Sequence, residues 1–396
     1  MESRSRLSVV LWIALAWCFP TGAFVCSCGA PAEELSLTVH VIAPSSTLKD
    51  AYLCIVGADS QWGNWDPASG ARLTKESDSV WSLTRRVPRG YTIEFKVTRG
   101  SWDTEALYEA GQRPSNFSIV VKRDTTMTLR PVDWADNIHT EAARSEIVGN
   151  VRYHHAIKSL ALRYARDVVV WLPPSYSTTT TTRYPVLYVH DGQNVFDAST
   201  SAFGHEWRAD EVADSLIRRH AIVEIIIVGI YNTRDRSKEY SDAEQGRNYA
   251  DFVAHELKPF IDSTYRTQPD RRHTAVMGAS SGGTISFLSV WWYPDVFSKA
   301  ACLSSAFTPD VTNILEQVRT YTGPRKDIRV YLDMGSRGVD SSLKASTDAM
   351  FSLLKAQGYA EGVDLVMHYD KEADHNEQAW AARLHRPLIF LFGNHH

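Results

Sequence analysis

The sequence predicts a small antiparallel β-sandwich followed by an α/β domain with a mostly parallel sheet. Between residues 35 and 134, short runs of alternating apolar and polar residues are separated by turn signals, which is typical of a sandwich. After residue 147, short apolar runs alternate with helix-period segments, which indicates a parallel sheet covered by helices. The 396 residues are 44% hydrophobic and 22% charged, an ordinary globular composition that excludes a wholly disordered or fibrous chain.

The N-terminus has the pattern of an export signal. Arg4 and Arg6 precede a charge-free apolar run, Leu7–Phe19, and small residues follow at 21–23. This run is shorter than the roughly 20 residues that a membrane span needs. We therefore expect a signal peptide over residues 1–23 and a secreted or periplasmic protein with no transmembrane helix. The segment before Cys28 loosely resembles a lipobox, so a lipid anchor at Cys28 is the alternative.

The first domain is expected over residues 34–134. Its apolar runs alternate in the manner of half-buried strands, and no helix-period segment interrupts them. A disulfide between Cys54 and Cys302 is not expected, because the two cysteines fall in different domains. The expected strands are Leu37–Ile42, Ala51–Val56, Val80–Val87, Tyr91–Val97, Phe117–Val121 and Thr125–Leu129.

The second domain is expected over residues 147–396. Its apolar runs are continuous, as in strands buried on both faces. The expected strands are Val168–Leu172, Val186–Val189, Glu224–Ile230, Thr274–Met277, Arg329–Leu332 and Leu365–His368. The helix-period segments are Tyr249–Tyr265, Ser342–Gln357 and Asn376–Phe392.

A G-x-S-x-G motif at residues 278–282 lies between an expected strand and an apolar stretch that suits a helix. In this setting the glycines permit a tight turn that projects the central serine at the carboxyl edge of the sheet. Ser280 is therefore the predicted nucleophile. Ser281 is the rival, although Ala279 would then replace the leading glycine.

A serine hydroxyl needs a base to accept its proton. Where the serine lies in a turn between a strand and a helix, the acid and then the histidine follow it along the chain, so the base should be a histidine near the end of the domain. His375 follows the strand Leu365–His368 across a short polar loop and fits that position. His368 lies within the strand and His385 within a helix, so we expect both to be structural.

The carboxylate that orients the histidine should follow the strand Arg329–Leu332. Asp340 lies in the loop beyond Gly335 and is the favoured acid. Asp333, at the end of the strand, remains the rival. Asp374 is adjacent to His375 in sequence and is expected to shape its loop.

With these residues in place, the segment 147–392 resembles the esterase family of α/β-hydrolases that includes feruloyl, acetylxylan and siderophore esterases. The motifs that carry the resemblance are Val186–Asn194 (VLYVHDGQN), Gly229–Asn232, Gly278–Gly283 and His375–Glu377. The resemblance implies an oxyanion hole formed by the backbone amides of Gln193 and Ser281. Gly338 stands where many members carry the acid, which is why Asp333 remains open.

The first domain resembles the starch-binding modules of family 20. The segment Trp62–Pro67 (WGNWDP), Trp81 and Phe95–Val97 carry this resemblance, which implies that Trp65 stacks on sugar rings with help from Lys96. A second stacking tryptophan is missing at its usual place, and Tyr108 or Trp102 could substitute. In the alternative interpretation, Trp65 and Trp81 simply form the core.

These features together predict an exported serine carboxylesterase that hydrolyses an ester, acting on an acylated polysaccharide such as feruloyl or acetyl xylan. A siderophore esterase, an acyltransferase and a non-catalytic glycan-binding protein are the alternatives. The net charge of −4 disfavours nucleic acid as a partner. We expect no metal and no cofactor, since the sequence has no phosphate-cradling glycine loop and no Cys/His ligand spacing.

Overall fold

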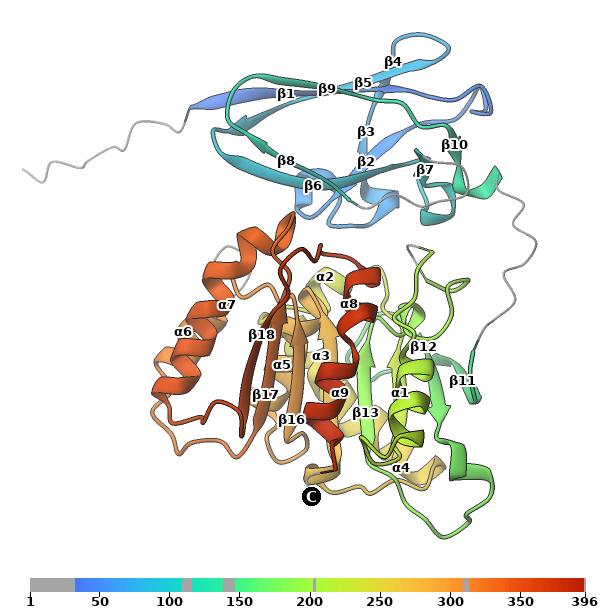
Figure 1. Ribbon diagram of the computed structural model, residues 1–396. Helices are drawn as coiled ribbons and strands as arrows, with labels where there is room; N and C mark the ends of the chain where they lie inside the picture. Colours follow the sequence, from blue (N-terminus) through green and yellow to red (C-terminus); the bar gives the residue numbers. More distant parts are fainter. Residues whose placement is uncertain (1–32, 109–115, 138–146, 202–203, 309–312, 395–396) are drawn as a thin grey trace, which may run out of the picture.

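The computed structural model describes residues 33–108, 116–137, 147–201, 204–308 and 313–394. It contains a β-sandwich above an α/β domain (Figure 1). The expected signal peptide and Cys28 lie outside the described residues, so export stays a prediction. Among the helices that are described, none is both long and apolar enough to cross a membrane.

The sandwich consists of two four-stranded sheets that enclose one apolar core. The strand orders are β4-β5-β1-β9 and β3-β2-β6-β8, and β7 pairs separately with β10. The strands are β1 (Glu34–Ile42), β2 (Cys54–Gly57), β3 (Ala71–Arg72), β4 (Thr74–Lys75), β5 (Val80–Pro88), β6 (Tyr91–Thr98), β7 (Ala106–Leu107), β8 (Phe117–Val121), β9 (Thr125–Leu129) and β10 (Asp133–Trp134).

Alternation along β1 shows why this unit folds as a sandwich. Leu35, Leu37, Val39 and Val41 are buried while the residues between them are partly exposed, as expected for a strand with one face on the core. The antiparallel sandwich is confirmed with one exception: β1 and β9 run parallel. The first and last long strands of the unit thus lie side by side.

The second unit contains an eight-stranded sheet of order β11-β12-β14-β13-β15-β16-β17-β18. Six neighbouring strands of this sheet run parallel, in the order β14, β13, β15, β16, β17 and β18. β12 and β11 extend the sheet beyond β14, and each pairs antiparallel with its neighbour. The strands are β11 (Asn150–Ile157), β12 (Arg166–Leu172), β13 (Val186–His190), β14 (Ile226–Ile230), β15 (Thr274–Ala279), β16 (Lys299–Leu303), β17 (Arg329–Met334) and β18 (Leu365–Tyr369).

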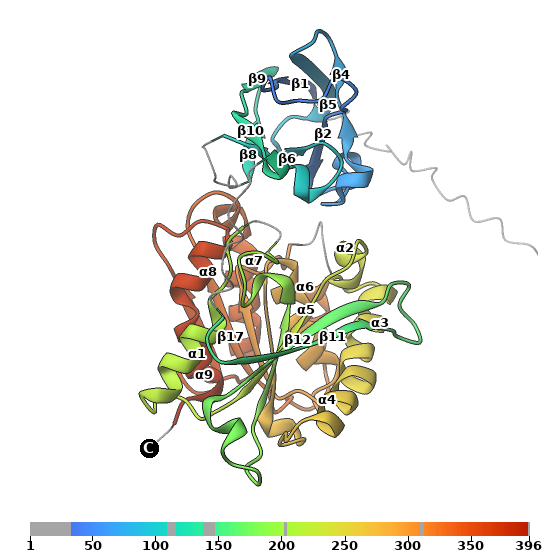
Figure 2. The ribbon, with the colours of Figure 1, turned by 90° about the vertical axis from the view of Figure 1, so that its right-hand side faces the viewer.

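Helices cover both faces of this sheet, as Figure 2 shows from the side. The apolar residues of α1, α8 and α9 pack on one face, and those of α3 to α7 pack on the other. The helices are α1 (Ala209–Arg218), α2 (Arg236–Glu239), α3 (Glu244–Asp251), α4 (Lys258–Thr264), α5 (Ser281–Trp292), α6 (Ile314–Arg319), α7 (Val339–Ala356), α8 (Glu377–Arg383) and α9 (His385–Phe392).

Two helix predictions need correction. The segment 376–392 forms two helices, α8 and α9, because Pro387 has no amide to donate to the carbonyl of Arg383. The segment 249–265 is interrupted by a π-helical turn, Phe252–Leu257, just before Pro259. The strands β11 and β16 were not expected from the sequence.

The carboxyl ends of the parallel strands meet at the edge of the sheet that lies beneath the sandwich (Figure 1). The segments that follow β13, β15, β17 and β18 carry Gln193, Ser280, Asp340 and His375, respectively. Asp340 was expected in a loop, but it lies in the first turn of α7. The topology therefore brings all the predicted active-site residues of this domain to one edge.

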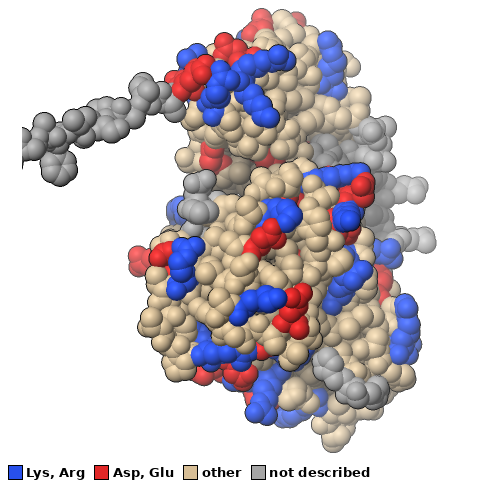
Figure 3. All heavy atoms as spheres, turned by 60° about the vertical axis from the view of Figure 1, so that its left-hand side comes forward, with Lys and Arg blue, Asp and Glu red and all other residues tan. Residues whose placement is uncertain are grey.

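Basic and acidic side chains are interspersed over the face of the molecule shown in Figure 3.

Candidate active site

Ser280 occupies the turn between β15 and α5. Its backbone has φ 56° and ψ −127°, a conformation that a residue with a side chain adopts only when its surroundings impose it. The Ser280 amide donates to the carbonyl of Leu303 in the neighbouring strand β16, at 2.9 Å. The turn is thus held in its strained form by the sheet itself.

The leading glycine of the motif is required by close approach of the backbone. A Cβ atom added to Gly278 would lie 2.4 Å from the carbonyl carbon of Gly282. Any side chain at residue 278 would force the strand and the helix apart. The leading glycine therefore reflects a packing constraint between β15 and α5.

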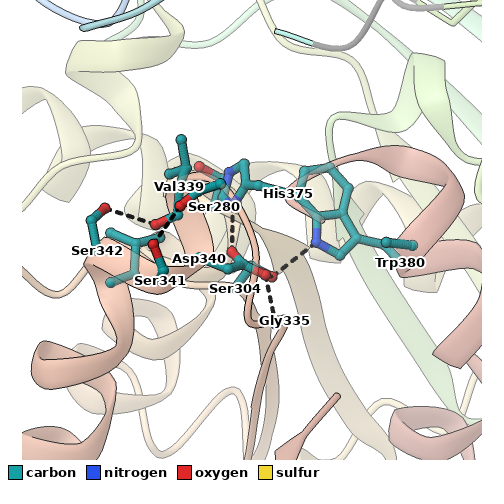
Figure 4. Close-up of polar contacts among 12 residues, drawn as sticks. Ser280, Ser304, Gly335, Val339, Asp340, Ser341, Ser342, His375 and Trp380 are labelled. Atoms are coloured by element: carbon teal, nitrogen blue, oxygen red, sulfur yellow. Dashed lines mark hydrogen bonds and ion pairs between the residues drawn. The ribbon is translucent and has the colours of Figure 1, made fainter. Parts of the chain in front are cut away.

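His375 and Asp340 are in direct contact. Nδ1 of His375 lies 2.6 Å from Oδ1 of Asp340, and both side chains are buried (Figure 4). The second carboxylate oxygen of Asp340 accepts from the Ser304 hydroxyl at 2.9 Å and from the Gly335 amide at 2.5 Å. Ser280 and His375 line the same cleft, so the structure brings together the three residues that the sequence singled out.

Asp333 lies elsewhere. It is fully buried at the end of β17, where one carboxylate oxygen is 3.1 Å from Nε of Arg383. Its pKa is raised, because burial outweighs the attraction of Arg383. The carboxylate that reaches the histidine is therefore that of Asp340.

The contact between His375 and Asp340 shifts both pKa values. Burial alone would lower the pKa of His375, but Asp340, Glu94 and Glu377 raise it above its ordinary value of 6.5. Burial would likewise raise the pKa of Asp340, yet the hydrogen bond from His375 holds it below its usual range. Asp340 is thus a carboxylate at neutral pH and favours the imidazolium form of His375.

Gln193 and Ser281 both line the cleft, at the first turns of two helical segments. Gln193 belongs to a 3₁₀ turn, η6 (Gly192–Asn194), and Ser281 begins α5. Amides in a first helical turn have no partner within the helix, so they can bind a negatively charged oxygen. This placement agrees with the expected oxyanion hole, whose role stays a prediction.

Sequence reasoning missed an ion pair beneath η6. Arg236 forms a bidentate contact with Asp191, at 2.7 and 2.8 Å, and Asn232 donates to the same carboxylate at 2.6 Å. Asp191 itself has a left-handed backbone, φ 58°. Burial would raise the pKa of Asp191, but Arg236 keeps it below the usual range. This ion pair, whose carboxylate is buried, holds the loop that carries the Gln193 amide.

Sequence reasoning also assigned no role to Ser304 or Trp380. The Ser304 hydroxyl contacts Asp340 and accepts from Nε1 of Trp380 at 3.1 Å and from Arg383 at 2.8 Å. The ring of Trp380 lies edge-on to His375, with centroids 5.1 Å apart. Only a prediction of β16 could have directed attention to Ser304, which follows that strand directly.

The family described as "Putative esterase" matches residues 159–391, more than half of the chain. The chain belongs to this esterase family. The starch binding domain family matches residues 34–129, over the sandwich.

Relatives of this esterase include a two-function protein of Xylanibacter ruminicola, described as an endo-1,4-beta-xylanase/feruloyl esterase. The two are 27% identical over 199 residues, which cover 49% of this chain and 25% of that protein. Because so little of that relative is matched, the activity of the whole relative is no guide to this chain.

Solved structures extend the likeness of the esterase fold. A ferulic acid esterase has a TM-score of 0.52 at 22% identity, over 61% of this chain and 98% of its own. The enterobactin esterase of Shigella flexneri has a TM-score of 0.52 at 14% identity, over 88% of this chain and 90% of its own. At these identities the likeness shows the fold alone, and in the second case it extends into the sandwich.

The esterase cleft is lined by both units. Its volume is about 1350 Å³, and its lining includes Ser280 and His375 from the α/β domain as well as Trp65 and Lys96 from the sandwich. Trp65 is half-buried, whereas Trp81 is 1% exposed and belongs to the sandwich core. The interpretation of Trp65 as a core residue is therefore wrong, and that of Trp81 is confirmed.

Lys96 is more buried than we expect for a lysine that binds sugar. Its side chain is 2% exposed, and Nζ lies 2.5 Å from a carboxylate oxygen of Glu105. Lys96 is part of the lining of the cleft, but its ammonium group is engaged in this buried ion pair. Trp102 lies next to Trp65, with ring centroids 6.3 Å apart.

Proposed function

We propose that this esterase is an exported serine carboxylesterase that cleaves an acylated carbohydrate through an acyl-enzyme. The observation that carries the proposal is the conjunction of a strained, cleft-lining Ser280 with a buried Asp340–His375 pair. A triad needs these three groups in these roles.

In the proposed reaction, Oγ of Ser280 attacks the ester carbonyl carbon while Nε2 of His375 takes the hydroxyl proton. The amides of Gln193 and Ser281 stabilise the negative charge on the former carbonyl oxygen. The carbon–oxygen bond to the alcohol then breaks, and His375 returns its proton to the departing alkoxide. Water attacks the acyl-enzyme by the same steps, which releases the acid and restores Ser280.

Asp340 contributes by holding His375. Its contact with Nδ1 directs Nε2 toward the cleft and stabilises the imidazolium that forms when the proton is taken. Ser304 and the Gly335 amide fix the carboxylate in turn, so the acid cannot rotate away. His375 is thus oriented before any substrate binds.

The carbohydrate part of the proposal rests on the sandwich. It matches a starch binding domain, and Trp65 is half-buried in the cleft. Aromatic faces pack well against the C–H faces of sugar rings. An N-terminal segment with the pattern of a signal peptide supports export to where such substrates occur.

A panel of esters tests this proposal. Purified protein is assayed on p-nitrophenyl acetate and on acetyl, feruloyl and siderophore esters, with Ser280→Ala as the inactive control. We expect hydrolysis of the model ester and of at least one sugar ester, all lost in the variant. Activity confined to siderophore esters would contradict the carbohydrate part, and activity that survives in Ser280→Ala would contradict the mechanism.

A further inference from the structure

The cleft has one wall from each domain. The sandwich wall includes Asn64, Trp65, Glu94, Trp102 and Asn116, and the opposite wall includes Ser280. The sugar-binding candidates of the sandwich therefore face the nucleophile and not the outer surface. This is unlike a module that only tethers an enzyme to a polymer, because such a module would present its binding face away from the catalytic domain.

The loop that carries Trp65 is strained. Gly63, Asn64 and Trp65 have φ values of 86°, 48° and 59°, so three successive residues are left-handed. A bulky residue in this region is a genuine outlier, which persists only where the structure enforces it. Here the Trp65 amide donates to the carbonyl of Gly57 at 2.8 Å, which anchors the loop to β2.

Trp65 and Trp102 form an aromatic platform. Their planes differ by 32° and their centroids are 6.3 Å apart, and both rings are half-buried in the cleft lining. The sandwich core is filled by other tryptophans, Trp62, Trp81 and Trp134, each at most 1% exposed. The platform is therefore not needed to fill the core, and its flat faces suit sugar rings.

Polar groups for sugar hydroxyls lie on the same wall. The side-chain amide of Asn116 donates to Glu94 at 2.9 Å, and both residues line the cleft. The Glu94 carboxyl also interacts electrostatically with His375 and Asp340 of the other domain. The sandwich wall is thus within electrostatic reach of the catalytic residues.

The size of the cleft fits an extended ligand. Its volume of about 1350 Å³ exceeds the roughly 300–1,000 Å³ that is usual for small-molecule sites. It can hold several sugar rings together with an acyl group. A long polymer lying on a granule, however, would have to enter between the two domains.

We propose that the sugar end of the ester lies on the Trp65–Trp102 platform while its acyl group is at Ser280, so that one substrate spans both domains. The sandwich is then the leaving-alcohol subsite of the enzyme, and the substrate class is a short, soluble, acylated oligosaccharide of the starch type. The inference rests on the proposed esterase function.

Matched pairs of esters test this inference. Within each pair the acyl group is the same and only the alcohol differs: p-nitrophenyl acetate against O-acetyl maltotriose, and methyl ferulate against O-feruloyl maltotriose. For Trp65→Ala, and likewise for Trp102→Ala, we expect kcat/KM on the sugar ester to fall about 5- to 150-fold, the range that an aromatic stacking contact supports. Activity on the matching small ester should not change.

Two further variants serve as controls. Leu48→Ala removes an exposed apolar side chain of the same sandwich that is not part of the cleft lining, and it should leave both rates unchanged. Trp65→Phe keeps a flat ring and should recover part of the lost activity. Melting temperatures of all variants identify any loss that comes from unfolding.

Several results would overturn the inference while the esterase function stands. One is a Trp65→Ala variant that loses binding to insoluble starch yet keeps full kcat/KM on the soluble sugar esters, as expected of an independent tether. A second is wild-type protein that cleaves the small esters and no maltotriose ester. Wild-type protein that cleaves none of the four esters would contradict the proposed function itself.

Discussion

Single side chains hold His375 from two directions. Asp340 contacts its Nδ1, and the edge-on ring of Trp380 lies beside it. Ser304 links Asp340 and Trp380, because its hydroxyl donates to the Asp340 carboxylate and accepts from the Trp380 indole. A change at any of these positions should act on catalysis through the orientation of the imidazole.

Asp340→Asn is expected to lower kcat on p-nitrophenyl acetate by on the order of 10⁴, because the amide cannot stabilise the imidazolium or fix its tautomer. Asp333→Asn is the matched control. It removes a buried charge opposite Arg383, so its main effect should be on stability, measured as a lower melting temperature. Equal losses of kcat in the two variants would contradict the assignment.

The acid limb of the pH profile should lie above pH 6.5. His375 must be neutral to accept the Ser280 proton, and its folded pKa is raised above 6.5, so the base is lost to protonation already at mildly acidic pH. The measurement is kcat/KM on p-nitrophenyl acetate as a function of pH. A rate that stays flat down to about pH 5 would exclude His375 as the base.

Among the helices and strands, the sequence predicted the active-site turn correctly because that turn needs glycine at a fixed position. The G-x-S-x-G motif predicted the β15–α5 turn, because no other residue fits at Gly278. The chain order then led to His375 and Asp340, which the structure brings together. Ser304 escaped notice because β16 is a short strand of mostly small residues that starts with a lysine, so no strong apolar signal marks it.

Helix breaks were missed for a related reason. The apolar period continues across Leu384, so periodicity alone predicts one helix where the missing amide of Pro387 makes two. The parallel β1–β9 pair also has no sequence signal, since alternation in a strand does not tell which strand lies beside it.

Two tryptophans of the sandwich should lose different amounts of stability on truncation. Trp81→Ala removes a ring that is 1% exposed, so the free energy of unfolding should fall by about 3–5 kcal/mol. Trp65→Ala removes a half-buried ring outside that core and should cost clearly less. Denaturant unfolding of both variants provides the comparison, and an equal loss would return Trp65 to the core.

At the scale of the whole molecule, the main feature is the placement of the sandwich over the carboxyl edge of the sheet (Figures 1 and 2). The sequence predicted both domains and their binding candidates separately. It could not predict that Trp65 and Ser280 line one cleft, because no local pattern encodes how two domains dock.

Glu94→Gln tests this docking in solution. The Glu94 carboxylate raises the pKa of His375, although burial raises the pKa of Glu94 itself. To the extent that Glu94 is ionised, its replacement should move the acid limb of kcat/KM toward lower pH. Glu34→Gln, an exposed change in β1 of the same sandwich, is the control and should leave the profile in place. An acid limb that does not move in Glu94→Gln would contradict an ionised Glu94 beside His375.

The proposed mechanism requires Ser280 to be the nucleophile. A fluorophosphonate probe is added to wild-type protein, and the modified residue is identified by peptide mass spectrometry. We predict a single adduct on Ser280, absent from Ser280→Ala and from protein in which His375 has been protonated at low pH. An adduct on Ser281, or one that persists in Ser280→Ala, would contradict the claim.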